Sequence, residues 1–198
     1  MKLYLNKASP YARLVLVVAH EKGLAKDLEL VWTDPWASEE KLLAVTPFSK
    51  VPALIAHDGL PLVESACICD YLDERGGAPR LMPPSGADRV AALRKLGLGR
   101  GLIDASFGAV IQKRFGGDGN SVLFERWRAS VLRAVMAIDR NPTPSLSPDL
   151  GDLVIAVALG YLDFRMADVK WRAEATRLSA WHDRVCARES MIATAPEQ

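Results

Sequence analysis

Residues 2–13 of the sequence read KLYLNKASPYAR and combine a strand with the start of a helix. Lys2–Leu5 is short and mostly apolar, which is typical of a strand. Ser9 and Pro10 then predict a helix N-terminus, because serine is a preferred N-cap and proline is favoured at the first helical position. The helix is expected to run to about Lys22, where the following glycine can end it. A strand that leads directly into a helix indicates an α/β arrangement in this part of the chain.

The chain continues to alternate strands and helices up to residue 75. His57-Asp58-Gly59 predicts a hairpin turn between two short strands. Ser65 is expected to cap the helix that follows the hairpin. In order, we predict a strand, a short helix, two strands and a helix at Leu28–Trp32, Ser38–Val45, Val51–Ala56, Leu60–Val63 and Ser65–Arg75.

The second half of the chain is predicted to be helical, because apolar residues recur there every three or four positions. They are Leu93, Leu96, Ile103, Phe107 and Val110 in one segment and Phe124, Trp127, Val131, Val135 and Ile138 in the next. Asp149 is expected to cap a nearly all-apolar helix that runs through Met166, the pattern of a central buried helix. Breaks between helices are predicted at Phe115–Asn120 and Asn141–Pro148.

The stretch Gly76–Gly86 separates these two halves and contains three proline and three glycine residues. Such a composition is typical of a linker. We therefore predict an α/β domain at residues 1–76, a linker at 77–86 and an all-helical domain at 87–198.

Composition and charge exclude several classes of protein. The 25 Lys and Arg residues nearly balance the 24 Asp and Glu residues, and a net charge of +1 does not favour a nucleic-acid partner. Three cysteine residues cannot build a disulfide framework, and they lack the histidine companions of a zinc site, so no metal is expected. The apolar run Leu153–Leu159 is too short to span a membrane. These features predict a soluble cytoplasmic protein.

Ser9 is the first candidate for a functional side chain. The plain interpretation is that its hydroxyl only satisfies a main-chain N–H at the helix start. The functional interpretation is that the positive end of the helix dipole and the hydroxyl together stabilise an anion. Both cysteine positions of the glutaredoxin motif Cys-Pro-Tyr-Cys are replaced here, by Ser9 and Ala12, so thiol–disulfide exchange is not expected.

Two further stretches could bind an extended peptide with a zwitterionic end. In Lys50-Val51-Pro52-Ala53-Leu54, a cis Val51–Pro52 bond would turn the main chain of Val51 outward to pair with a peptide. Ser65 and the N-terminus of its helix could hold a carboxylate, while Glu64 could pair with an ammonium group. A plain structural interpretation, an edge-strand proline and a capping residue, exists for each stretch. Taken together with an anion at Ser9, the three sites describe glutathione.

At this point the sequence resembles the glutathione S-transferase family over nearly its whole length. The resemblance rests on Ser-Pro-Tyr-Ala-Arg from Ser9, on the stretch Thr46–Leu54, on Glu64-Ser65, and on Asp149-Leu150-Gly151-Asp152, which is similar to the family's buried N-capping box. Residues Gly160–Arg165 and the end of the chain from Trp181 to Ser190 resemble bacterial members. Ser9 lies four residues before Arg13, as in the serine-type pattern.

The resemblance implies an α/β thioredoxin-like N-terminal domain followed by an all-α C-terminal domain. It also implies that glutathione is the co-substrate, without a metal, and that Lys50, Val51, Glu64 and Ser65 bind it while Ser9 activates its thiol. The second substrate would be a small, largely apolar electrophile, held against the helix that carries Ile103, Phe107 and Ile111, and the role would be detoxification. A homodimer is expected, with the helices at Ser65–Arg75 and Ala87–Arg114 across the interface.

Several alternatives stay open. Tyr4 or Tyr11 could activate the thiol in place of Ser9. The protein could be a glutathione-dependent peroxidase, isomerase or dehalogenase, or a binding or regulatory module without catalysis.

The N-capping box carries Asp149 where the family usually has serine or threonine, and aspartate is still a sound N-cap. The glycines from Gly97 to Gly101 favour close helix packing or a kink over a nucleotide loop, and the three histidines are not expected to be catalytic.

Overall fold

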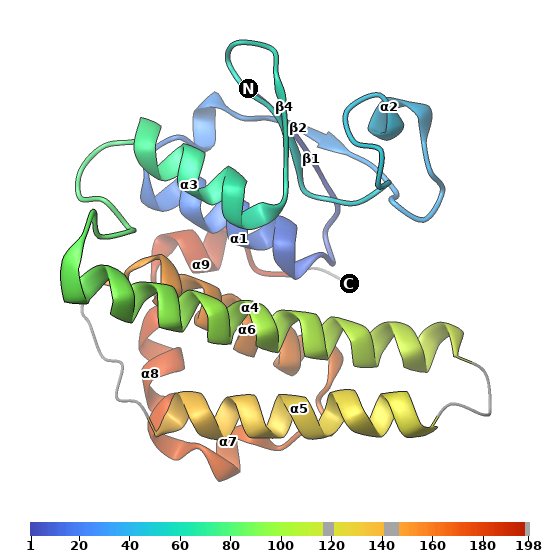
Figure 1. Cartoon of the computed structure of the whole chain (residues 1–198), viewed down its shortest axis with the longest axis vertical. Helices are drawn as coiled ribbons and strands as arrows, with labels where there is room; N and C mark the ends of the chain where they lie inside the picture. The colour runs from blue at the N-terminus through green and yellow to red at the C-terminus, as the bar shows by residue number, and fades with distance from the viewer. Residues whose placement is uncertain (117–120, 141–146, 197–198) are drawn as a thin grey trace. The chain divides into compact units, whose positions relative to one another are not determined.

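The computed structural model describes residues 1–116, 121–140 and 147–196, and their contacts divide the chain into two compact units (Figure 1). The first unit comprises Met1–Met82 together with the described residues from Glu189 onward, and the second comprises Pro83–Arg188. A thioredoxin-like α/β unit and an all-helical unit are the two parts expected from the sequence.

The first unit is built on a four-stranded sheet with the order β2-β1-β3-β4. The strands are β1 (Lys2–Leu5), β2 (Glu29–Trp32), β3 (Ala53–Ile55) and β4 (Pro61–Val63). The pair β1 and β2 is parallel, and β3 is antiparallel to both β1 and β4. The four strands confirm the predicted ones with slightly shorter bounds.

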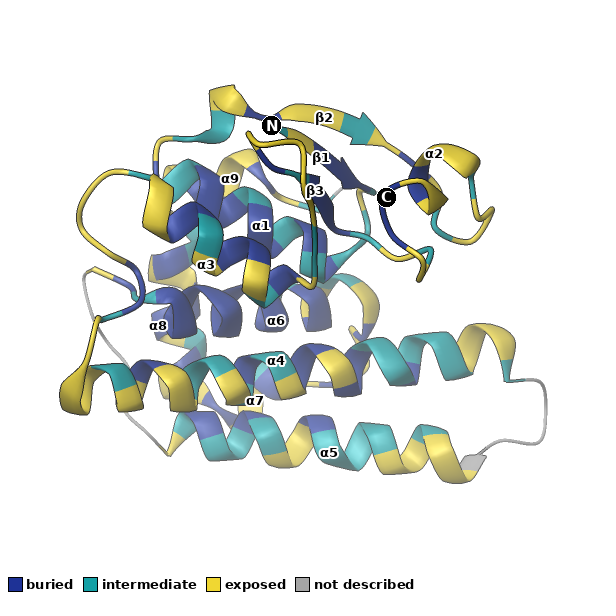
Figure 2. Ribbon diagram, turned by 45° about the horizontal axis from the view of Figure 1, so that its top comes forward, coloured by how far each residue is buried: buried dark blue, intermediate teal, exposed yellow. Residues whose placement is uncertain are grey.

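Both faces of the central strand β1 are buried. Leu3 and Leu5 are fully buried and share one face of the strand, because side chains alternate between faces. Tyr4 points to the opposite face and packs in a cluster with Leu42 and Val45, at and just after the short helix α2 (Glu40–Leu43). The longer helices α1 (Pro10–Glu21) and α3 (Ser65–Arg75) lie side by side (Figures 1 and 2).

The C-terminal helix α9 (Glu189–Ala193) belongs to the first unit, because it packs on α1. The sequence analysis placed these residues in the helical domain, following their order along the chain. Contacts between residues more than 160 positions apart, such as Ser190 with Glu21, bring them to the first unit instead.

The second unit is a bundle centred on α6 (Leu150–Arg165), and most of α6 has the buried colour in Figure 2. Around it are α4 (Gly86–Phe115), α5 (Ser121–Asp139), α7 (Trp171–Glu174) and α8 (Thr176–Cys186). Gly99 of α4 permits close packing on α6, since a Cβ there would lie 2.7 Å from Cγ1 of Val154. This confirms close packing as the reason for Gly99. The predicted breaks at Phe115–Asn120 and Asn141–Pro148 fall largely outside the described residues.

The N-terminus of α6 carries the expected capping box. The main-chain N–H of Asp152 donates to the Asp149 carboxylate at 2.9 Å, and the N–H of Asp149 donates back to the Asp152 carboxylate at 3.1 Å. Lys95 of α4 adds a cation between them, with Nζ 2.8 Å from Oδ2 of Asp152. Burial raises the pKa of Asp152 despite Lys95, and the neighbouring Asp149 carboxylate adds to the effect. Lys95 therefore compensates the second negative charge that an aspartate N-cap brings to this box.

Candidate functional site

Ser9 is the N-cap of α1, as predicted, and the cap leaves its hydroxyl with a proton to donate. The main-chain N–H of Ala12 donates to Oγ of Ser9 at 3.2 Å. A serine hydroxyl has one donor and two acceptor positions, so accepting this bond does not use its O–H. The first turn of α1 contains no acidic residue, and its positive end is therefore not neutralised from within the helix. Ser9 can cap the helix and donate a hydrogen bond to an anion at the same time.

The two tyrosines that were kept as alternatives occupy different surroundings. Tyr4 is 9% exposed and packs in the cluster with Leu42, Val45 and Ala53. Tyr11 is the second residue of α1 and is partly buried. Ser9 is the one of the three that occupies the helix N-cap itself.

Val51 lies two residues before the start of β3, and its main-chain N–H and C=O are open. The Val51–Pro52 peptide bond is cis, as predicted. Among the hydrogen bonds of residues 1–116, 121–140 and 147–196, none involves the main-chain N–H or C=O of Val51. Both groups can therefore pair with an extended peptide. Lys50 beside it is exposed.

The start of α3 differs from the expected cap. Glu64, not Ser65, occupies the N-cap position, and its Oε1 accepts the main-chain N–H of Ser65 at 3.0 Å. Ser65 is the first helical residue and is fully buried. The expectation that Ser65 caps this helix is wrong. Ser65 is already helical, and its main-chain N–H is satisfied by the carboxylate of the preceding residue, Glu64.

Glu64 also has a strained main chain, with φ of +73°. A left-handed conformation is uncommon for residues other than glycine, and such strain is often found at functional sites. The Glu64 side chain is exposed at this turn. A carboxylate, a buried hydroxyl and a helix N-terminus are thus concentrated at two consecutive residues, the groups expected to bind an α-amino-acid end.

The sheet topology brings the stretches around Ser9, Val51 and Glu64 to the same end of the sheet. The register pairs Tyr4 with Ala53 and Ala53 with Val63 across the three adjacent strands. Since β3 is antiparallel to both neighbours, the carboxyl ends of β1 and β4 lie beside the amino end of β3. Ser9 follows the first of these ends, Glu64 the second, and Val51 precedes the third. These residues were predicted one motif at a time, and the register places their three stretches at the same end of the sheet.

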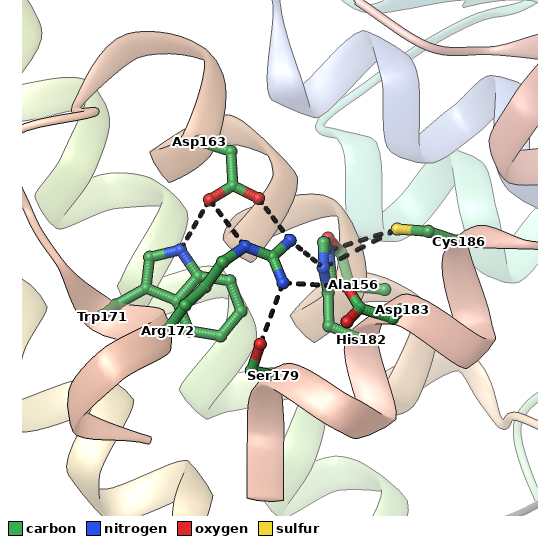
Figure 3. A network of polar contacts seen from close by, with 8 residues as sticks. All are labelled: Ala156, Asp163, Trp171, Arg172, Ser179, His182, Asp183 and Cys186. Carbon is green, nitrogen blue, oxygen red and sulfur yellow. Dashed lines mark hydrogen bonds and ion pairs between the residues drawn. The ribbon is translucent and has the colours of Figure 1, made fainter. Parts of the chain in front are cut away.

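The structure also assembles a polar network in the second unit that the sequence analysis missed (Figure 3). Nδ1 of His182 lies 2.9 Å from Nη2 of Arg172, and Nε2 lies 3.1 Å from the carbonyl oxygen of Ala156. Arginine can only donate and a carbonyl can only accept, which assigns the proton to Nε2. The pKa of His182 is lowered, first by burial and then by the charge of Arg172, although the bond to Ala156 opposes this.

Cys186 lies 3.3 Å from Nε2 of His182, one helical turn along α8, which is the spacing of a possible cysteine–histidine pair. The histidine cannot act as a base for this thiol, because Nε2 carries the proton and Nδ1 accepts from Arg172. Arg172 also binds the carboxylates of Asp163 and Asp183, at 2.7 and 2.8 Å. The network therefore joins α6, α7 and α8.

The described residues contain no group of three or more histidine, cysteine, aspartate or glutamate side chains placed to hold a metal ion. None of the described helices combines the length and the hydropathy of a membrane span.

Comparison with known families matches both units. Residues 8–75 match the model described as glutathione S-transferase, N-terminal domain, and residues 121–184 match the glutathione S-transferase, C-terminal domain. The first match includes the proposed Ser9, Val51 and Glu64 stretches, and the second includes α5, α6 and α7 of the helical unit.

Individual proteins match over the whole chain or over part of it. A glutathione transferase family member from Pseudomonas fluorescens Pf-5, crystallised with bound glutathione, is 32% identical and superposes with a TM-score of 0.94, covering 100% of this chain and 99% of that one. The uncharacterized GST-like protein YibF of Escherichia coli is 24% identical over 99% of this chain and 98% of its own length. A stringent starvation protein A homolog from Pasteurella multocida is 40% identical over 42% of this chain and 38% of its own length.

Proposed function

Because the chain belongs to the glutathione S-transferase family, we propose that it is a glutathione transferase that joins the glutathione thiolate to small, largely apolar electrophiles. The observation that carries this proposal is the strand register, which brings the Ser9, Val51 and Glu64 stretches to the same end of the sheet. The similar protein from Pseudomonas fluorescens, whose structure contains glutathione, supports the same ligand.

Each proposed binding residue recognises a different part of glutathione. The N–H and C=O of Val51 pair with the peptide backbone as an added strand does. Glu64 binds the ammonium group, and Ser65 with the N-terminus of α3 binds the neighbouring carboxylate. This requires the exposed Glu64 carboxylate to move away from the N–H of Ser65. The exposed ammonium of Lys50 is the proposed partner of the carboxylate at the other end.

Ser9 acts on the sulfur. A free thiol of the cysteine type has a pKa of about 8.5, so only a small fraction is thiolate at neutral pH. The O–H of Ser9 donates to the thiolate, and the N-terminus of α1 adds the field of its dipole. The sulfur then forms a bond to the electrophilic carbon, and the electron pair of the broken bond leaves with the displaced group.

A binding or regulatory module without catalysis is the second candidate. The identity of 40% to part of a stringent starvation protein A homolog favours it, because that protein is not named as a transferase. The glutathione site would then serve recognition alone. A glutathione-dependent peroxidase, isomerase or dehalogenase would use the same site with a different second substrate.

The cytoplasm is the proposed location and detoxification the proposed role. Cys67, Cys69 and Cys186 form no disulfide bond in the structure, which fits a reducing compartment. A homodimer is part of the same proposal and follows from the family.

Retention on immobilised glutathione, followed by turnover assays, tests the proposal. We expect the protein to be retained, to be eluted by free glutathione, and to consume at least one aryl halide or isothiocyanate from a panel that also contains hydroperoxides. Turnover of hydroperoxides alone would favour the peroxidase. Retention without turnover of any of them would favour the binding module. Failure to bind glutathione in a calorimetric titration of folded protein would contradict both readings of the site.

A further inference from the structure

The C-terminal helix α9 binds α1 through two consecutive residues, Ser190 and Met191. Oγ of Ser190 donates to Oε1 of Glu21, the last residue of α1, at 2.5 Å. Nη2 of Arg13, in the first turns of the same helix, donates to the main-chain carbonyl of Met191 at 3.3 Å. Figures 1 and 2 both show α9 beside α1. Two consecutive residues of α9 therefore bind side chains from the first turns and from the last residue of the helix that Ser9 caps.

Burial shows that α9 is docked and not merely adjacent. Ser190 and Met191 are 4% and 2% exposed, and Thr194 is 8% exposed. Ile192, between them, is 65% exposed. One face of the segment is thus buried while the other faces solvent, as expected for a short helix held by its neighbours rather than by its own length.

Arg13 connects this docking to the candidate catalytic residue. Arg13 lies four positions after Ser9, which places both residues on the same side of the first turn. Its own N–H donates to the carbonyl of Ser9 at 3.0 Å. The position of the Ser9 hydroxyl therefore depends on the same turn that the guanidinium anchors to α9.

We propose that Arg13 is a positioning residue, which holds the first turn of α1 against the carbonyl of Met191 so that the Ser9 hydroxyl points at the bound thiolate. The inference rests on the proposed function, since it takes Ser9 as the donor. It makes α9, which is distant in sequence, part of the machinery that activates the thiol. A hydrogen bond weakens steeply when its distance and angle depart from the favourable range, so a small displacement of this turn is enough to reduce activation.

Arg13→Met tests the role, because methionine keeps an aliphatic stem but cannot donate to Met191. Arg75→Met, in the last turn of α3, removes the same charge from the same unit and is the matched control. Two quantities are measured in each variant. One is the pKa of the thiol of bound glutathione, from the ultraviolet absorbance of the thiolate against pH. The other is hydrogen exchange of the Ala12 and Arg13 amides without glutathione.

In Arg13→Met we expect faster exchange of both amides and a thiol pKa that rises by about half a unit to one unit. At a pH below both pKa values this is about three- to tenfold less thiolate. The affinity for glutathione should change little, since Val51, Glu64 and Ser65 still bind the peptide. Arg75→Met should leave both quantities as in the unchanged protein.

A double-mutant cycle separates this role from a direct effect of the arginine charge on the thiolate. Deletion of residues 189–198 removes the acceptor, and Met191→Ala loosens the same docking if the deletion does not fold. If Arg13 acts through Met191, the deletion or Met191→Ala should raise the thiol pKa as Arg13→Met does. Combining Arg13→Met with either of these changes should then raise the thiol pKa little further. Additive shifts would overturn the inference, because they would show that the arginine acts without α9.

The outcomes distinguish the inference from the proposed function. Unchanged exchange in Arg13→Met overturns the inference, whether or not glutathione binds. Faster exchange with an unchanged thiol pKa, in a protein that binds glutathione, also overturns it. If the unchanged protein does not bind glutathione, the proposed function fails and the positioning of Ser9 for a thiolate fails with it, while the exchange data still report whether α9 anchors α1.

Discussion

The hydroxyl of Ser9 accepts the N–H of Ala12 and keeps its own proton for another partner. Helix capping and thiol activation are therefore compatible at this residue, although the sequence analysis treated them as alternatives. A substitution that removes the hydroxyl removes both interactions. Separating them requires a residue that caps the helix without a hydroxyl.

Ser9→Gly and Ser9→Ala form a pair that makes this separation. Alanine at an N-cap costs about 1 kcal/mol of stability, whereas glycine costs only a few tenths. Both variants lose the donor to the thiolate, and a hydrogen bond to a charged group contributes about 1.5–3 kcal/mol. We expect turnover at neutral pH to fall about ten- to a hundredfold in both, while the melting temperature falls mainly in Ser9→Ala.

The measurements are a pH–rate profile, a glutathione titration and a thermal melt of each variant. Glutathione should still bind, because the rest of the peptide is held elsewhere. Normal turnover in Ser9→Gly, with an unshifted pH–rate profile, would exclude Ser9 as the activating residue, and Tyr4 and Tyr11 would be tested next.

Between the helices of the first unit, a buried ion pair joins α1 to α3. Nζ of Lys22 lies 3.0 Å from Oδ1 of Asp73, and both side chains are only 1% exposed. Asp73 also accepts the main-chain N–H groups of Leu81 and Met82, at 2.7 and 2.9 Å. Lys22 donates in addition to the carbonyl of Pro79 at 2.8 Å. The pair thus ties the C-terminal ends of both helices to residues that were predicted to be part of a linker.

Asp73→Asn is expected to destabilise the first unit by about 3–5 kcal/mol, because it leaves the buried ammonium of Lys22 without its partner. Asp70→Asn, on an exposed position of the same helix, is the matched control with the same change of charge. Urea unfolding at neutral pH measures the difference between the two. A loss below about 1 kcal/mol for Asp73→Asn would contradict the importance of the pair.

The pH dependence of this loss follows from the pKa of Asp73. Burial alone would raise that pKa, but the bonds from Leu81, Met82 and Lys22 outweigh it, and the folded-state pKa is lowered. The stabilisation is therefore present above the pKa of the unfolded chain, about 4, and is lost as the pH falls through the lower folded-state value. The difference in unfolding free energy between the unchanged protein and Asp73→Asn should shrink below about pH 4.

For the molecule as a whole, the proposed homodimer depends on helix faces that the chain leaves exposed. On α4, Val90 and Leu93 are 67% and 45% exposed. Apolar side chains on an exposed helix are a common feature of interfaces between subunits, although single ones are also normal on a surface. The helices Ser65–Arg75 and Ala87–Arg114 are the ones proposed to form the interface.

Light scattering at micromolar concentration is expected to give about twice the chain mass of 21.6 kDa. Leu93→Glu should shift the mass toward that of one chain, because a carboxylate would be buried at the interface. Leu132→Glu on α5, whose leucine is 42% exposed, lies outside the proposed interface and should stay dimeric. A mass near 21.6 kDa for the unchanged protein would contradict the dimer.

Local signals in the sequence were sufficient to predict most helices and strands and to select the residues of the candidate site. Ser9-Pro10 predicted the start of α1, the capping box predicted the start of α6, and the apolar run after Asp149 predicted its burial. These features depend on hydrogen bonds and spacing within one or two turns, so the residues themselves carry the information. The three stretches described glutathione before any family was named, and the family resemblance added the thioredoxin-like fold, the electrophile and the homodimer.

Other features depended on residues that only folding brings together. Glu64 occupies the N-cap position that was expected for Ser65, and α9 packs in the first unit. The hydrogen bonds of His182 with Arg172 and Ala156 fix its tautomer. The bonds from Arg13 to Met191 and from Lys22 to Asp73 span 178 and 51 positions along the chain. No local pattern specifies such partners, because their distance is set by how whole helices pack, and only the tertiary structure decides which donor meets which acceptor.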